Sequence, residues 1–260
     1  MLNSVAKNNF WRMQNDDYRN LLRLNSEPSS VVYGQNRLHR ATAQLPVAVK
    51  CIDERVVLDQ PALGLAGSGV LLSDEDFAIV SKKLKAIGIK LATYHEHCGA
   101  CSLFCDEWQK TTGQSRAIME VAHESACKLQ NYFNPKSYVH LAGYSDECHI
   151  NMIGDPSLHH ARAIIIDYSG RFNARELNLP AAFLISAAYH PSPAYTTKEI
   201  NIALSIALGS HGFGVEMFSS EPLAVVCIGS PIQIDSHKTI VAEATKPFDQ
   251  TTTLLNLAIM

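Results

Sequence analysis

Two short segments of this 260-residue chain bring together residue types that bind metal ions. Cys51 is followed at two-residue steps by Asp53 and Arg55, and His95 is followed three residues later by Cys98. Two thiolates and one imidazole leave the fourth position of a tetrahedral zinc ion open, which is typical of catalytic zinc. Asp53 and Arg55 project to the same side of an extended segment as Cys51, so an ion pair can form beside the metal.

Both segments follow predicted strands. Residues 45–52 form an almost continuous apolar run, typical of a strand covered on both faces, and a second strand is predicted over residues 89–94. Between them, Ser73 is the predicted N-cap of a helix that ends at Gly88. The order of strand, helix and strand favours two parallel strands joined by a right-handed crossover. Ligands bind at the carboxyl ends of such strands, so the two metal-binding segments are expected to meet there.

These segments resemble those of the β-class carbonic anhydrases. The pattern Cys-x-Asp-x-Arg, then strand, helix, strand and His-x-x-Cys-Gly is similar to that family, and residues 83–99 follow its passage from helix to metal loop. The resemblance covers about residues 46–132. The glycine-rich turn at 64–69 follows the Asp–Arg pair so soon that the chain looks more like divergent members such as the cadmium-accepting carbonic anhydrases.

The resemblance implies an α/β fold with a mainly parallel central sheet flanked by helices, an N-terminal helical arm and an extended C-terminal portion. It also implies Zn²⁺ held by Cys51, His95 and Cys98. The implied activity is the reversible hydration of carbon dioxide to bicarbonate, in which hydroxide on the zinc attacks carbon dioxide. Carbon dioxide and bicarbonate are therefore the expected small-molecule partners.

The family pattern also gives roles to residues around the metal. Asp53 would either accept a hydrogen bond from the zinc-bound water or take its place as a fourth ligand, and Arg55 would control which of these occurs. Backbone around Ala66, Gly67 and Gly69 would border the substrate. A related interpretation keeps the same machinery but changes the substrate to carbonyl sulfide or carbon disulfide.

Other ligands and other functions stay open at the level of sequence. His97 is a competing metal ligand, although a polar loop residue is favoured, and Cys105 is a rival ligand, although burial on a helix face is favoured. A catalytically silent zinc-binding or regulatory relative would keep the metal site and use its C-terminal part for partner contacts. A weaker alternative is a cysteine hydrolase with Cys98 as the nucleophile.

The remaining polar candidates are interpreted as surface residues or as satisfied core residues. Glu54 and Glu96 could face the pocket, but solvated positions are favoured because acidic loop residues are usually exposed. The histidines and cysteines without a convincing ligand set are His123, Cys127, Cys148, His149, His159, His160, His190, His211 and His237.

Composition excludes several classes of protein. The net charge is −3 without a basic run, so no nucleic-acid partner is expected. No apolar stretch approaches the roughly 20 residues that span a bilayer, and no signal peptide is recognisable, so no membrane partner and a cytoplasmic location are predicted. Seven cysteines, an odd number, argue against a disulfide scaffold and favour metal ligation or catalysis.

A single α/β domain over residues 1–260 is predicted, with a helical arm at 1–40, a metal-site core at 46–132 and further strands and a helix at 136–260. The N-terminal helix carries an apolar stripe that this core does not account for, so a homodimer or higher homo-oligomer is expected. The other predicted elements are helices at 8–24, 115–132 and 197–208 and strands at 138–142, 163–168, 181–185 and 223–228.

Overall fold

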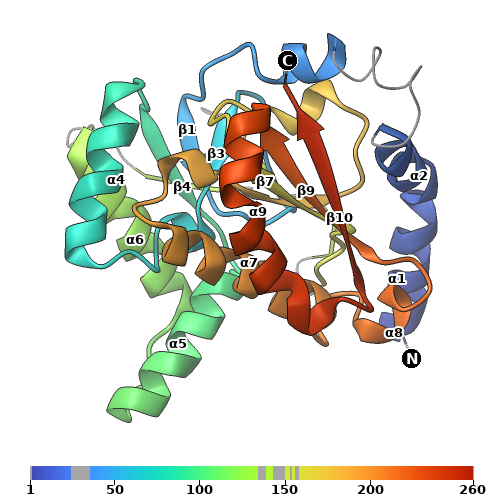
Figure 1. Ribbon diagram of the computed structural model, residues 1–260. Helices are drawn as coiled ribbons and strands as arrows, with labels where there is room; N and C mark the ends of the chain where they lie inside the picture. The colour runs from blue at the N-terminus through green and yellow to red at the C-terminus, as the bar shows by residue number, and fades with distance from the viewer. Residues whose placement is uncertain are drawn as a thin grey trace.

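The computed structural model describes residues 2–24, 36–133, 139–142, 150–152, 154–155 and 158–259. Within these residues the chain is an α/β protein, in which two four-stranded parallel sheets are flanked by helices (Figure 1). The predicted α/β class with parallel strands and flanking helices is confirmed, whereas the parallel strands form two sheets and not the one central sheet that was expected. The likeness to the β-carbonic anhydrase fold stays a prediction. Cys148 and His149, two of the residues singled out in the sequence, lie outside the described residues.

The first sheet carries both metal-binding segments. Its order is β3-β1-β4-β5, with β1 at Ala48–Lys50, β3 at Ala62–Gly64, β4 at Leu91–Tyr94 and β5 at His140–Leu141. The predicted parallel pairing of the first strand with the strand before His95 is confirmed, since β1 pairs with β4. On its other side β1 pairs with β3, which was not predicted and which ends at Gly64, the first residue of the glycine-rich turn.

Helices cover this sheet and lead away from its edge. Helix α4 (Asp74–Ala86) begins at the predicted N-cap, where Ser73 Oγ accepts a hydrogen bond from Asp76 N at 3.1 Å. Helix α5 (Gly99–Thr112) starts directly after Cys98 and projects from the body of the molecule, and α6 (Ile118–Phe133) packs against α4 and β4 (Figure 1). No helix within the described ranges is long and apolar enough to cross a membrane.

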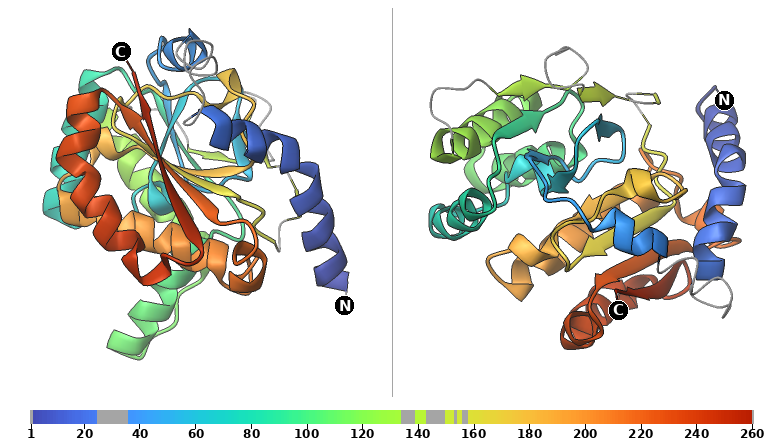
Figure 2. Two further views of the ribbon diagram at one scale, coloured as in Figure 1. Left: turned by 45° about the vertical axis from the view of Figure 1, so that its right-hand side comes forward. Right: turned by 90° about the horizontal axis from the view of Figure 1, so that it is seen from above.

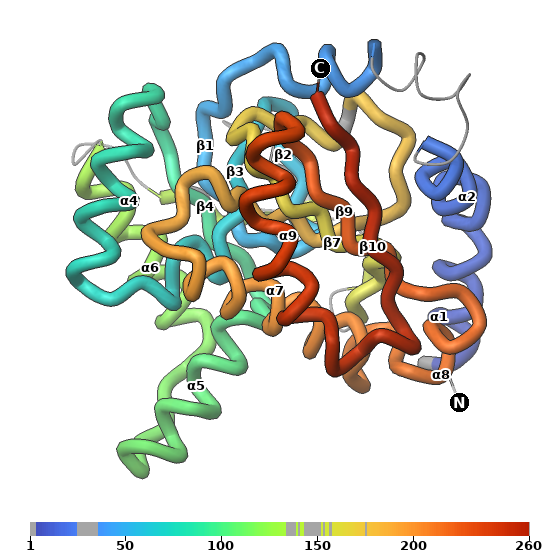
Figure 3. Tube along the Cα trace, in the orientation of Figure 1, coloured from blue at the N-terminus to red at the C-terminus, as the bar shows by residue number. Residues whose placement is uncertain are grey.

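The C-terminal half builds the second sheet, in the order β10-β9-β7-β8. Its strands are β7 (Ala163–Asp167), β8 (Ala182–Ile185), β9 (Leu223–Gly229) and β10 (Thr252–Ala258). Helices α7 (Pro193–Leu208) and α9 (Pro231–Thr245) pack together on one face, and the short α8 (Val215–Phe218) precedes β9 (Figure 3). A two-stranded antiparallel ladder, β2 (Val56–Leu58) with β6 (Ile150–Met152), completes the described strands.

The two sheets meet edge to edge along β3 and β8. Leu184 N donates a hydrogen bond to Ile52 O at 3.0 Å, and Ser186 N donates to Gly64 O at 2.9 Å. Gly64 permits this approach, because a Cβ at this position would lie 1.8 Å from Leu184 O. The seam brings the C-terminal half of the chain next to the strand end that carries Cys51.

The predicted helix over residues 8–24 is interrupted at Gln14. Helix α1 (Leu2–Met13) ends before it and α2 (Asn15–Leu24) begins after it. Gln14 Nε2 donates to His160 O at 2.8 Å, and Gln14 Oε1 accepts from Ala181 N at 2.7 Å. These two bonds tie the junction of α1 and α2 to the C-terminal half of the chain, and both helices lie on one side of the molecule (Figure 2).

The apolar stripe of these helices differs from the expected one. Met13 is 77% exposed, whereas Tyr18 and Leu21 are buried against the second sheet of their own chain. The Arg162 guanidinium lies 4.0 Å from the Trp11 ring and 4.1 Å from the Tyr18 ring, which adds cation–π contacts to this packing. The metal-site core does not cover these residues, as expected, but the second sheet of the same chain does, so the stripe does not require a second chain. Oligomerisation itself stays a prediction.

Leu21→Ala should lower the free energy of unfolding by about 2–5 kcal/mol, because it leaves a cavity between α2 and the second sheet. Met13→Ala is the matched control on the exposed side of the preceding helix and should change stability by less than about 0.5 kcal/mol. Chemical denaturation at several protein concentrations measures both. A Leu21→Ala effect that grows with dilution would instead place Leu21 in a contact between two chains.

Candidate metal centre

The three predicted ligands converge at the carboxyl edge of the first sheet. Cys51 follows β1, His95 follows β4, and Cys98 is the N-cap of α5. One ligand atom from each lies within 4.8 Å of the others, and the two sulfur atoms are 3.7 Å apart. All three side chains are buried. The expected meeting of the two segments is confirmed.

The chemistry of this group fits a metal ion. Two sulfurs on one tetrahedral zinc lie about 3.8 Å apart for Zn–S bonds of about 2.3 Å, close to the observed separation and far from the roughly 2.05 Å of a disulfide. His95 Nδ1 donates to Glu96 O at 2.8 Å, which leaves the lone pair on Nε2. That buried Nε2 makes no hydrogen bond within the described part of the chain. A Cys–His–Cys group of this geometry can bind a metal ion.

Backbone amides face both sulfur atoms. Gly67 N donates to Cys51 Sγ at 3.3 Å and Cys101 N donates to Cys98 Sγ at 3.5 Å. Burial raises the pKa of the Cys51 thiol, and contact with the Cys101 thiol, with burial, raises that of Cys98. Without a metal both groups are neutral thiols, so metal binding must release their protons.

Asp53 and Arg55 form the predicted ion pair. Arg55 Nη2 lies 2.7 Å from Asp53 Oδ2 and Arg55 Nε lies 3.0 Å from Asp53 Oδ1, a bidentate arrangement. Burial alone would raise the pKa of Asp53, but His95 and Arg55 outweigh burial and lower it, so the carboxylate is ionised. Asp53 Oδ2 is also 3.5 Å from His95 Nε2, which places the carboxylate beside the metal ligands.

Lys50 bonds the backbone of the segment that joins Cys51 to Arg55. Its buried ammonium donates to Cys51 O at 3.0 Å and to Asp53 O at 2.9 Å, and burial lowers its pKa. These two bonds fix the backbone between the first ligand and the ion pair. Sequence reasoning gave Lys50 no role, because a lysine within an apolar strand carries no local signal of its carbonyl partners.

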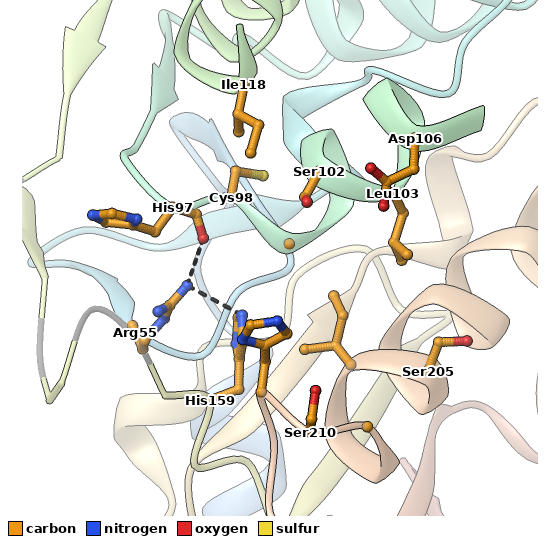
Figure 4. Close-up of a pocket in the computed structure, with 14 residues that line it drawn as sticks. Arg55, His97, Cys98, Ser102, Leu103, Asp106, Ile118, His159, Ser205 and Ser210 are labelled. Carbon is orange, nitrogen blue, oxygen red and sulfur yellow. Dashed lines mark hydrogen bonds between the residues drawn. The ribbon is translucent and has the colours of Figure 1, made fainter. Parts of the chain in front are cut away.

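A cavity of about 430 Å³ opens beside the metal centre (Figure 4). Arg55, His97, Cys98 and His159 line one end of it, close to the ligands. Helix α5 and the second half of the chain both contribute polar and apolar side chains to the remaining wall. Further lining residues are Ser102, Leu103, Asp106, Ile118, Ser205, Ile206, Ser210 and His211.

The predicted substrate-bordering backbone lies elsewhere. Ala66 is fully buried, and Ala66 N donates to Glu199 Oε1 at 2.6 Å. Gly67 faces the Cys51 sulfur, and Gly69 borders a separate cavity of about 140 Å³. None of the three is among the residues that line the cavity beside Cys98. Their proposed contact with substrate stays a prediction, and Gly67 is the one of the three whose amide bonds the Cys51 sulfur.

The rival ligands do not join the group. Cys105 is buried on α5, as favoured by its spacing, and is not among the ligand atoms that converge. His97 lines the cavity and its carbonyl oxygen accepts from Arg55 Nη2 at 3.0 Å. The predicted ligand set is the one that the fold assembles.

Two buried histidine–carboxylate contacts were not foreseen. His159 Nδ1 lies 3.1 Å from Glu54 Oε2, and His190 Nε2 lies 3.2 Å from Glu199 Oε2. Asp53, Glu54 and His159 also form a second group whose atoms lie within metal-binding distance of one another. The expectation of a solvated Glu54 is wrong: the side chain is buried, and its partner lies 105 residues away, where no local pattern reveals it.

A comparison of the chain with protein families, with curated proteins and with solved structures finds no match. The class that the fold and site define is an α/β protein with a buried Cys–His–Cys group that can bind a metal ion.

One metal ion per chain is expected in the purified protein. Cys98→Ser should lose it, because a hydroxyl is a far poorer ligand for zinc than a thiolate. Cys105→Ser is the matched control on the same helix and should retain full metal. Elemental analysis after gel filtration measures both. Full metal in Cys98→Ser with loss in Cys105→Ser would move the site along α5.

The metal-free protein should lose stability as the pH rises above about 8.5. The pKa of both thiols is raised in the folded chain, so the unfolded chain, with cysteine pKa values of about 8.5, loses these protons first. The free energy of unfolding should then fall by up to about 1.4 kcal/mol per pH unit for each thiol. Denaturation of metal-free wild type and Cys51→Ala/Cys98→Ala between about pH 7.5 and 10 isolates the effect. Parallel slopes for the two proteins would contradict it.

Proposed function

We propose that this protein is a zinc-dependent enzyme of the β-carbonic anhydrase type that catalyses the reversible hydration of carbon dioxide. The observation that carries the proposal is the bidentate Asp53–Arg55 ion pair beside the Cys51, His95 and Cys98 group. A purely structural zinc site takes a fourth Cys or His and has no use for a buried charged pair at its open side.

Each protein group has a defined task in this proposal. Zinc held by the three ligands would supply a water molecule whose pKa is near 7. Asp53, kept ionised by Arg55, accepts a hydrogen bond and thereby orients the attacking oxygen. Arg55 occupies both carboxylate oxygens, which keeps Asp53 from becoming a ligand itself. The cavity beside Cys98 admits the substrate.

A sulfur analogue is a second candidate substrate. Leu103, Ile118 and Ile206 line the cavity, and an apolar wall of this kind favours a small uncharged substrate, which describes carbonyl sulfide and carbon disulfide as well as carbon dioxide. The same water and the same Asp53 would serve its hydrolysis. Release of hydrogen sulfide from either compound distinguishes this activity from hydration of carbon dioxide.

Arg55→Ala should keep its zinc yet lose hydration activity by about a hundredfold, the scale expected when the partner of a group beside a metal is removed. The reason is that Asp53, without its guanidinium, becomes free to bind the metal. Asp53→Ala should also lose activity but keep an exchangeable position on the metal. Stopped-flow hydration of carbon dioxide on zinc-loaded proteins between about pH 6.5 and 9 measures these changes.

The control for these variants is Lys82→Ala, an exposed substitution on α4 away from the site, which should retain full activity. Zinc-loaded wild type that hydrates neither carbon dioxide nor its sulfur analogues across this range would favour a catalytically silent zinc-binding relative.

A further inference from the structure

His159 reaches the metal centre from the C-terminal half of the chain. It is only 4% exposed, its ring packs 5.6 Å from the Phe183 ring, and it lines the cavity beside Cys98. Its two nitrogens have different partners: Nδ1 lies 3.1 Å from Glu54 Oε2, and Nε2 lies 3.2 Å from Arg55 Nη2 (Figure 4). The function proposed above uses neither His159 nor Glu54.

These contacts fix where the neutral ring carries its proton. A guanidinium can only donate hydrogen bonds, so His159 Nε2 must be the acceptor of the Arg55 contact. The ring proton is therefore on Nδ1, which donates to the Glu54 carboxylate. Glu54 is held in turn by His160 N, which donates to Oε1 at 2.8 Å. A chain of contacts runs from Glu54 through His159 to Arg55 and Asp53.

Gly99 makes room for this arrangement. A Cβ at residue 99 would lie 3.2 Å from His159 Nε2 and 2.8 Å from Ile206 Cδ1. The glycine that follows the ligand Cys98 thus lets an imidazole from the second half of the chain approach the first turn of α5.

The same geometry disfavours a second metal ion at Asp53, Glu54 and His159. Arg55 already bonds both carboxylate oxygens of Asp53 and donates to His159 Nε2. Its guanidinium therefore lies where a cation would have to bind. A positive charge at this place repels a metal ion.

We propose that His159, oriented by Glu54, is a positioning residue that holds Arg55 in its bidentate contact with Asp53. This proposal rests on the proposed function, since it assigns His159 a task within the same site. Arg55 Nη2 is held by Asp53, by His97 O and by His159. Loss of the imidazole acceptor weakens this anchoring, which lets the guanidinium turn away and frees the Asp53 carboxylate to bind the metal.

Two substitutions of His159 separate positioning from mere packing. In His159→Gln the side-chain amide oxygen reaches the place of Nε2 and can still accept from Arg55. In His159→Asn the shorter amide reaches only the place of Nδ1, so contact with Glu54 is kept and contact with Arg55 is lost. A structural role alone would be affected similarly by both, because each replaces a buried ring by a smaller amide.

The measurement is the visible spectrum of the cobalt(II)-loaded protein during titration with thiocyanate, which reports whether the metal has an exchangeable position. Wild type and His159→Gln should respond to the anion, and His159→Asn should respond about 10–100-fold more weakly. Asp53→Ala added to His159→Asn should restore the response, because the competing carboxylate is then gone. Hydration of carbon dioxide should fall in His159→Asn and not return in the double variant.

The outcomes that overturn the proposal are distinct. Equal responses of His159→Asn and wild type, or failure of Asp53→Ala to restore the response, would show that His159 does not act through Arg55 and Asp53. If His159→Asn does not fold, Glu54→Gln is the second variant and should weaken the response in the same direction. If the thiocyanate titrations give the expected responses but wild type does not hydrate carbon dioxide, the positioning role of His159 stands and carbonic anhydrase activity is rejected. Wild type that takes up no cobalt would overturn both.

Discussion

Charge balance at the end of β1 is the constraint on which the site depends. Four charged side chains, Lys50, Asp53, Glu54 and Arg55, are buried within six residues of chain, two of each sign. Burial of an unpaired charge costs several kcal/mol, so each of them needs a partner of fixed geometry. Lys50 has two backbone carbonyls, Asp53 and Arg55 have each other, and Glu54 has His159 and the His160 amide. The metal group obeys the same rule, because two neutral thiols and a zinc ion with two thiolates both carry no net charge.

The partners of Glu54 come from the C-terminal half of the chain, whereas each of the other three charges has a partner within residues 51–55. The first sheet brings Cys51 and the Cys98 segment to one edge, and the seam between β3 and β8 brings the second sheet alongside. His159 and the cavity residues of α7 then face the ligands across this seam. The C-terminal half, which a silent relative would use for partner contacts, is here part of the wall of the site.

The Cys–His–Cys group and the ion pair could be predicted from the sequence because their signals are local. Each lies within a few residues of a strand end. The ion pair was expected from alternation along an extended segment, whereas the chain turns at residues 54–55, where Val56 N donates to Asp53 O and Arg55 N donates to Asp53 Oδ1 at 2.9 Å. Glu54 and His159 escaped prediction because their contact joins positions 105 residues apart. Helix α9 was missed although Ser230 and Gln233 form a capping box that signals its start. The break at Gln14 was unpredictable, since it depends on backbone groups of His160 and Ala181.

The conformation of the turn after β3 explains how the glycine-rich segment contacts the Cys51 sulfur. Gly67 has a φ of 51°, a conformation that glycine adopts without steric cost, and it directs an amide at the Cys51 sulfur. Ser68, with a φ of 54°, bears real strain there, and its hydroxyl is tied to Thr93 O at 2.6 Å. Glu199, buried and paired with His190, holds the Ala66 amide at the start of the turn. An amide aimed at a sulfur stabilises the thiolate over the thiol, so the Gly67 amide acts against the burial that raises the pKa of Cys51 and favours the form that can bind a metal ion.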